Sequence, residues 1–370
     1  MSRPIVIAAG GTGGHMFPAT ALARELVRRG RPVVIACDAR GARYVGNALR
    51  RQVIRAASPS GSPAQRAAGF ARLGMGFAQS LVLLRRQRPL AVAAFGGYAS
   101  VPVALAARLL RIPVLVHEQN AVLGRANRLI ARRAGRLALI FRETRGAEIV
   151  PQACRVLTGN PVRAEIAALQ AQEYEAPVAG GPLRLLVVGG SQGARVFSDV
   201  LPEALKMLSA VARRRLRLTQ QCRPEDLERV AKAYAELDFK AEIESFFDDL
   251  PARLAAAHLV ISRSGASSVA ELLALGRPAL LVPYRFATDD HQRANAELVA
   301  DAGAAWMVGE AELDPPTLTA WLRGILEDPG QLAPMAERSR ALGRPNAAAA
   351  LADALASLAP STARVMEALA

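Results

Sequence analysis

Short apolar runs alternate with longer amphipathic stretches along the whole chain. The runs consist mainly of Val, Ile, Leu and Ala without polar alternation, which is typical of strands buried on both faces of a parallel sheet. The stretches between them have helical spacing, as at residues 18–29 and 269–275. Strands that alternate with helices predict an α/β protein with doubly wound parallel sheets. The predicted strands are 5–9, 33–37, 91–95, 114–117, 136–140, 183–188, 216–219, 241–245, 259–262 and 279–282.

The pattern restarts near the middle of the chain. After the turn residues Thr158-Gly159-Asn160-Pro161 and a polar segment at 170–182, a new strand leads into the loop GGSQG at 189–193. The first strand of the chain leads in the same way into GGTGG at 10–14. We therefore expect two Rossmann-like domains facing each other across a cleft, with bounds 1–161 and 162–343. An Ala-rich helix at about 344–370 is expected to pack back on the first domain.

Composition and charge narrow the class of protein. With 370 residues, 51% hydrophobic and 21% charged, the chain can bury sizeable cores, which argues against disorder. The net charge of +15 is uneven: residues 1–163 hold 26 Arg and 5 acidic residues (+21), and the remainder holds 21 basic and 27 acidic residues (−6). The basic half predicts an anionic partner, namely nucleic acid, a membrane surface or a phosphate-rich substrate.

Two further features bear on location. Three distant cysteines without metal-ligand spacing, and a start without a secretory signal, are typical of a reducing cytoplasm. Residues 89–107 carry no charge, but Gly96, Gly97 and Pro102 favour a buried strand, loop and helix over a membrane span.

Residues 66–88 predict an amphipathic helix with two interpretations. The helix either packs on the core or docks on an anionic membrane. Under the second interpretation, the contact residues are Phe70, Leu73, Phe77, Arg85 and Arg86.

The first glycine loop, residues 10–14, suits a diphosphate, because glycines permit close approach and the following helix offers free N–H groups. Tight strand–helix packing is an alternative reason for these glycines. His15 follows at the helix start, where the dipole favours neutral imidazole and so a general base. The alternative for His15 is a capping or ligand-orienting side chain.

Further polar groups follow other predicted strands. Ser262-Arg263-Ser264-Gly265 leads into a helix whose Glu271 can accept hydrogen bonds from sugar hydroxyls, although a serine N-cap is an alternative. His117-Glu118-Gln119-Asn120 fits a cleft, with a buried polar network as the alternative, and we interpret His258 as structural. Asp289 and Asp290 form no DxD motif, so no metal site or other cofactor is predicted.

Seven motifs together identify the chain as a member of the bacterial MurG family. They are GGTGGHMFPA, FGGYAS, HEQN, GNPVR, GGSQGAR, SRSGASSVAEL and DDHQ followed by NA, in that order. The resemblance extends from Ile5 to about Gly303, and Val101 stands where a smaller residue is expected. It implies a GT-B glycosyltransferase whose C-terminal domain holds UDP-GlcNAc and whose N-terminal domain holds the undecaprenyl-linked acceptor, lipid I.

The resemblance also implies site residues and partners. The family is peripheral on the cytoplasmic face of the cell membrane and acts in cell-wall synthesis, cell shape and division, beside other cell-wall proteins. Catalysis would use His15 as base, with Glu118 the rival. Gly96, Gly97 and Tyr98 would contact the acceptor. The donor-binding positions would be Thr12, Gly13, Gly14, Asn120, Arg163, Ser191, Gln192, Gly193, Phe247, Ala266, Ser267, Ser268, Val269, Ala270, Glu271 and Gln292.

Other classes of protein agree less well with the sequence. A UDP-GlcNAc 2-epimerase shares such a fold but needs no lipid. A nucleic-acid-binding module would show aromatic stacking positions and a known motif, and the sequence has neither. A nucleotide-sensing scaffold would need no paired sugar-binding groups.

Overall fold

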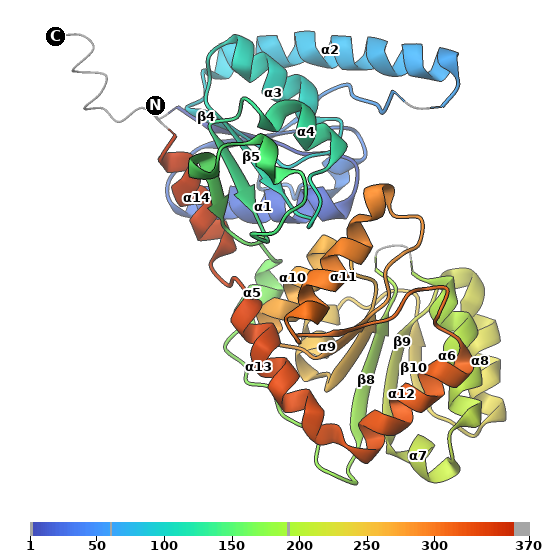
Figure 1. Cartoon of the computed structure of the whole chain (residues 1–370). Helices are drawn as coiled ribbons and strands as arrows, with labels where there is room; N and C mark the ends of the chain where they lie inside the picture. Colours follow the sequence, from blue (N-terminus) through green and yellow to red (C-terminus); the bar gives the residue numbers. More distant parts are fainter. Residues whose placement is uncertain (1–2, 60, 191–192, 359–370) are drawn as a thin grey trace. The chain divides into compact units, whose positions relative to one another are not determined.

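The computed structural model describes residues 3–59, 61–190 and 193–358 (Figure 1). The chain divides into two compact units, Met1–Arg163 with Asn346–Ala370, and Ala164–Pro345. The division between the units falls two residues after the predicted boundary at 161. Each unit contains one parallel sheet covered by helices on both faces, so each has a Rossmann-like fold.

The N-terminal unit is built on a seven-stranded sheet with the order β3-β2-β1-β4-β5-β6-β7. Alternate residues of β1 point to opposite faces: Ile5 and Ile7 join one hydrophobic cluster, and Val6 and Ala8 join another. The order reverses direction at β1, so the loops after β1 and β4 lie at a topological switch point, where ligands bind in such sheets. The strands are β1 (Ile5–Ala8), β2 (Val33–Cys37), β3 (Arg51–Val53), β4 (Ala91–Ala94), β5 (Val114–Glu118), β6 (Arg136–Leu139) and β7 (Arg155–Leu157).

Two helical layers cover this sheet. α1 and α14 pack together on one face, where Leu351 and Leu355 of α14 are buried and Arg29 forms an ion pair with Asp353. α2 and α3 pack together on the other face. The helices are α1 (Gly13–Arg28), α2 (Pro63–Gln87), α3 (Ser100–Leu109), α4 (Arg125–Ala131) and α14 (Ala347–Ala356), with 3₁₀ turns at Gly41–Tyr44, Ala147–Ile149 and Gln152–Cys154.

The C-terminal unit repeats the architecture with the strand order β10-β9-β8-β11-β12-β13, which reverses direction at β8. Its strands are β8 (Leu183–Val188), β9 (Leu216–Gln221), β10 (Ala241–Glu244), β11 (Leu259–Ser262), β12 (Ala279–Leu281) and β13 (Trp306–Met307). Its helices are α5 (Ala164–Ala168), α6 (Arg195–Met207), α7 (Ala210–Arg215), α8 (Leu227–Glu236), α9 (Leu250–Ala256), α10 (Ala266–Leu275), α11 (His291–Asp301), α12 (Pro315–Glu327) and α13 (Leu332–Leu342), with 3₁₀ turns at Pro224–Asp226, Thr288–Asp290 and Pro329–Gln331.

The uncharged segment 89–107 folds as β4, a loop and the buried start of α3, as predicted. Within the described residues, α2 is the one helix whose length and composition would let it cross a membrane, which is weak evidence by itself. Its last turns instead pack on the core, since Leu83 and Leu84 are buried.

The two interpretations of α2 divide along its length. Phe77 is half-buried against the core, so this side chain has a packing role. Phe70 is 60% exposed, Leu73 is half-buried, and Arg85 and Arg86 are exposed. The second half of α2 therefore packs on the core through one of its faces, as the first interpretation predicts. The first half exposes apolar side chains to solvent.

Candidate functional site

The first glycine loop continues directly into helix α1, which begins at Gly13 rather than at residue 18. His15 therefore lies in the first helical turn, where its backbone N–H donates to the carbonyl of Thr12. Thr12 and Gly14 are exposed and Gly13 is buried. The first turn leaves N–H groups and a positive dipole end available for an anion.

Asp38, at the end of β2, fixes the start of this loop. Its Oδ1 accepts hydrogen bonds from the N–H groups of Gly11 (2.9 Å) and Gly41 (2.8 Å). Burial by itself would raise the pKa of Asp38, but these two N–H groups and Arg40 outweigh it and lower the pKa. The sequence interpretation missed Asp38, although an acid directly after a buried strand was an available signal.

A second loop, after β4, packs against the first. Gly96 and Gly97 have φ of +84° and +70°, a region that L side chains rarely adopt. A Cβ on Gly96 would lie 3.0 Å from Cδ2 of His15, and one on Gly97 would lie 2.6 Å from the carbonyl oxygen of Gly10. The structure thus brings His15 together with Gly96 and Gly97, while Tyr98 beside them is half-buried.

The HEQN segment is mostly a buried polar network. His117 is fully buried, its Nε2 lies 3.0 Å from the Gly159 carbonyl oxygen, and its Nδ1 lies 3.0 Å from Nε2 of Gln119. The Gly159 carbonyl only accepts, so Nε2 carries the proton and Nδ1 accepts. The interpretation that all four residues face a cleft is wrong for His117, Glu118 and Gln119, because folding buries them; Asn120 is half-buried.

Glu118 organises the loop that follows β5. Its Oε1 accepts from the backbone and side-chain nitrogens of Asn120 (3.0 and 3.3 Å). Its Oε2 accepts from the Gly124 N–H (2.9 Å) and from Nδ2 of Asn127 (2.8 Å). Burial raises the pKa of Glu118, and these hydrogen bonds oppose the rise. Both carboxylate oxygens are therefore engaged within the protein.

In the C-terminal unit, the second glycine loop follows β8. The Gly189 N–H donates to Oε1 of Gln221 (3.3 Å), and a Cβ on Gly189 would meet the Ala194 nitrogen at 2.2 Å. Gly193 has φ of +69° and packs against Arg223. Ser191 and Gln192 lie outside the described residues.

Helix α10 follows β11 through the SRSG turn. Its N-cap is Gly265, with no side-chain cap, so a serine N-cap does not account for the motif. Val269 and Glu271 are buried at 1% and 7% exposure. Among the other predicted donor-binding positions on this helix, Ala266 is buried, and Ser267, Ser268 and Ala270 are half-buried.

The loop after β12 meets the same turn. Ser264 Oγ donates to the Gln292 carbonyl (2.8 Å), and the Tyr284 N–H donates to Oε1 of Gln292 (3.0 Å). Asn295 Nδ2 donates to the Ser264 carbonyl (3.0 Å). Gln292 is thus held beside the SRSG turn.

The remaining residues singled out from the sequence, Phe247, Arg163 and His258, lie in different parts of the two units. Phe247 is 6% exposed, and the guanidinium of Arg253 lies 4.4 Å from its ring centroid. Arg163 is the last residue of the first segment of the N-terminal unit, with its guanidinium 5.9 Å from the ring centroid of Phe17. His258 is buried, its pKa is lowered to about 4 by burial, and its Nδ1 accepts from the Arg184 N–H, which is a structural role.

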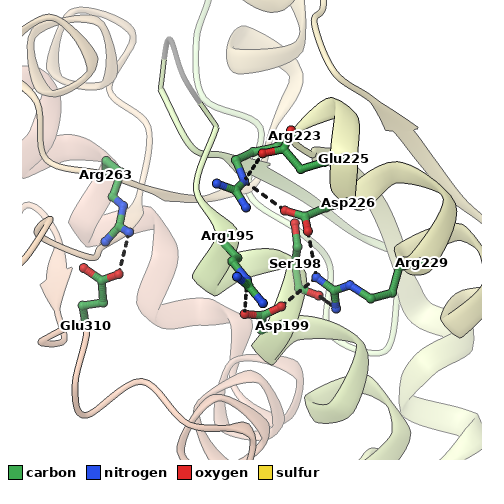
Figure 2. A network of polar contacts seen from close by, with 9 residues as sticks. All are labelled: Arg195, Ser198, Asp199, Arg223, Glu225, Asp226, Arg229, Arg263 and Glu310. Atoms are coloured by element: carbon green, nitrogen blue, oxygen red, sulfur yellow. Dashed lines mark hydrogen bonds and ion pairs between the residues drawn. The ribbon is translucent and has the colours of Figure 1, made fainter.

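A charged network lies beside the second glycine loop (Figure 2). Asp199 and Asp226 both bind Arg229, whose guanidinium also donates to the Ser198 carbonyl (3.3 Å). That carbonyl has no helical donor, because Pro202 lacks an N–H. The network therefore stabilises the first turns of α6.

Two parallel-sheet units, each with a glycine loop at its switch point, form a GT-B fold, and the match of both units to one glycosyltransferase family defines the class as a GT-B glycosyltransferase. Residues 5–139 match the N-terminal domain of glycosyltransferase family 28, and residues 184–352 match its C-terminal domain. The chain belongs to the MurG family within it.

Individual relatives agree over nearly the full length. The UDP-N-acetylglucosamine–N-acetylmuramyl-(pentapeptide) pyrophosphoryl-undecaprenol N-acetylglucosamine transferase of Rhodospirillum centenum is 51% identical, covering 95% of this chain and 93% of its own. The Rhodospirillum rubrum enzyme of the same name is 50% identical, with coverage of 94% and 90%. The crystal structure of Acinetobacter baumannii MurG has a TM-score of 0.79 at 30% identity, covering 96% of this chain and all of its own.

Proposed function

We propose that this enzyme transfers GlcNAc from UDP-GlcNAc to the C4 hydroxyl of the MurNAc residue of undecaprenyl-pyrophosphoryl-MurNAc-pentapeptide. The reaction converts lipid I into lipid II in peptidoglycan synthesis. The observation that carries the proposal is 51% identity, over 95% of the chain, to an enzyme named for this reaction. The geometry supports it, because each unit has its own glycine loop at a switch point, as two phosphorylated substrates require.

The C-terminal unit binds the donor in this proposal. Glu271 and Gln292 orient the sugar and ribose hydroxyls, and the loop at 189–193 together with the start of α6 stabilises the diphosphate. Burial of Glu271 strengthens any hydrogen bond that its carboxylate accepts, since nearby water is excluded.

The N-terminal unit binds the acceptor and supplies the base. His15 takes the proton of the attacking hydroxyl, a bond forms between that oxygen and C1 of GlcNAc, and the bond from C1 to the diphosphate breaks with its electron pair on UDP. Inversion at C1 follows from a single displacement. Glu118 is a positioning residue in this scheme, because both of its oxygens already accept hydrogen bonds from the loop after β5.

Transfer of labelled GlcNAc to a lipid I analogue tests the proposal. Lipid-linked product that requires both the protein and the acceptor supports it. A UDP-GlcNAc 2-epimerase would instead consume UDP-GlcNAc without any lipid, and that result would refute the transferase activity.

We also propose that the N-terminal unit attaches peripherally to an anionic membrane, at the cytoplasmic face of the cell membrane. The support is the charge of +21 on residues 1–163 and the exposed apolar side chains of α2, including Phe70 (60%), Met75 (41%) and Val82 (48%). Each basic side chain near such a surface contributes about 1 kcal/mol, screened by salt.

Sedimentation of the full chain with vesicles tests this attachment. Wild type should sediment with anionic vesicles, less at high salt, and not with neutral ones. A Phe70→Ser/Met75→Ser variant should bind less while retaining UDP-GlcNAc affinity. The matched control is Val178→Ser, an exposed apolar residue (76%) of the C-terminal unit. Undiminished vesicle binding by the double variant would place the attachment elsewhere.

A further inference from the structure

An ion pair between a buried arginine and a half-buried glutamate joins three loops of the C-terminal unit (Figure 2). Arg263, directly after β11, is 8% exposed, and its Nη2 donates to Oε1 of Glu310 at 2.9 Å. Glu310 lies between β13 and α12, 47 residues further along the chain. A pair that is largely withdrawn from water is costly to form unless its remaining hydrogen-bonding groups also find partners.

Those partners all belong to the segment that follows β12. Nη1 of Arg263 donates to the carbonyls of Val282 (3.2 Å) and Pro283 (3.4 Å). Oε2 of Glu310 accepts from the N–H of Arg285 (3.0 Å). The Arg263 guanidinium lies 5.4 Å from the ring centroid of Tyr284, a cation–π distance. The ion pair therefore holds residues 282–285 in place, through hydrogen bonds with their backbone and a contact with the Tyr284 side chain.

These contacts extend through Tyr284 to the side-chain amide of Gln292. The N–H of Tyr284 can only donate, so the Gln292 atom it meets at 3.0 Å is Oε1. Nε2 then points away from Tyr284, and no hydrogen bond within the described part of the chain uses it. The orientation of this amide, and hence which atom a ligand meets, depends on where Tyr284 is held.

We infer that Arg263 and Glu310 are positioning residues of the donor site: they fix residues 282–285 so that Gln292 presents its N–H groups to a hydroxyl of the donor's sugar. The inference rests on the proposed function, because it takes UDP-GlcNAc as the ligand. It predicts a larger effect on the sugar than on the nucleotide, since the polar contacts of the ion pair are with residues 282–285, which hold Gln292, whereas its contact with α6 is with the apolar ring of Phe197 (5.5 Å).

Glu310→Gln, Arg263→Lys and Gln292→Ala test the inference, with donor KM and kcat and with calorimetry using UDP-GlcNAc and UDP. Each variant should raise the KM and Kd for UDP-GlcNAc about tenfold, as for one lost hydrogen bond of roughly 1.4 kcal/mol. The Kd for UDP should change less than twofold on that scale. The control is Glu175→Gln, which removes the acid of an exposed Arg184–Glu175 pair and should change neither constant.

A combined Glu310→Gln/Gln292→Ala variant decides whether the two act together. Its affinity should equal that of Gln292→Ala, because residues that act through one contact are not additive. Additive losses, or equal weakening of UDP and UDP-GlcNAc in Glu310→Gln, would overturn the inference and leave the pair a purely structural role. If Glu310→Gln does not fold, Arg263→Lys gives the same comparison. Wild-type protein without any transfer would instead refute the proposed function itself.

Discussion

Replacing Gly97 with alanine should damage the acceptor-side loop through one steric contact. The left-handed conformation at Gly97 (φ +70°) costs an alanine about 1–2 kcal/mol. The new Cβ would also lie 2.6 Å from the Gly10 carbonyl oxygen, whereas ordinary contact begins at 3.4 Å, so the loop must move by 0.8 Å. Overpacking of this kind costs about 1–3 kcal/mol more.

The matched control is Gly30→Ala in the same unit. Gly30 has nearly the same conformation (φ +71°), but no atom lies within 4 Å of its Cβ position. Gly30→Ala should therefore lose only about 1–2 kcal/mol, and Gly97→Ala about 2–5 kcal/mol, of the free energy of unfolding.

Urea denaturation followed by circular dichroism measures the stabilities, and the transfer assay measures turnover. Gly97→Ala should also lower turnover, because the displaced Gly10 begins the loop that leads to His15. Gly30→Ala should retain wild-type turnover. Equal stabilities of the two variants, with full turnover in both, would show that the loop yields freely and would refute the steric reasoning.

Three further predictions concern titratable groups. His15→Ala should lower turnover ~10²–10⁴-fold with little effect on donor affinity, as for a general base; a change below about threefold in the transfer assay would show that His15 is structural and is not the base. Glu271→Ala should weaken UDP-GlcNAc binding by about 1.5–3 kcal/mol in calorimetry with the fold intact, and unchanged affinity would remove Glu271 from the site. Burial lowers the pKa of His117 from 6.5 to about 4, so the unfolded chain binds more protons between these values. The contribution of His117 to stability should therefore fall as pH drops from 6.5 to 4, by about 1.4 kcal/mol per pH unit, and the pH dependence of unfolding in urea should be flatter by this amount in His117→Gln.

Local pattern predicted the buried strands well, because a strand covered on both faces needs an unbroken apolar run. β2, β8 and β11 have the predicted bounds. β3, β7 and β13 were missed, since they are short and exposed or half-buried, and so carry little hydrophobic signal. The start of α1 was placed five residues late: glycine disfavours helix, yet Gly13 begins one, with its Cβ position 2.7 Å from the ring of Phe17.

The residues of the candidate site likewise fall into two groups, those predicted from the sequence and those found only in the tertiary structure. The sequence by itself predicted the glycine loops, His15 and Glu271. All of them follow a predicted strand, and the loops consist of small residues. These are local properties, and they place a residue at the ligand-binding edge of the sheet. The hydrogen bond between Asp38 and Gly11 and the Arg263–Glu310 pair are decided only by tertiary structure, since the partners lie 27 and 47 residues apart and no spacing relates them. The burial of Glu118 is likewise a result of tertiary structure. Its position at the end of a strand predicts an exposed carboxylate, but in the folded chain the following loop places hydrogen-bond donors around both of its oxygens.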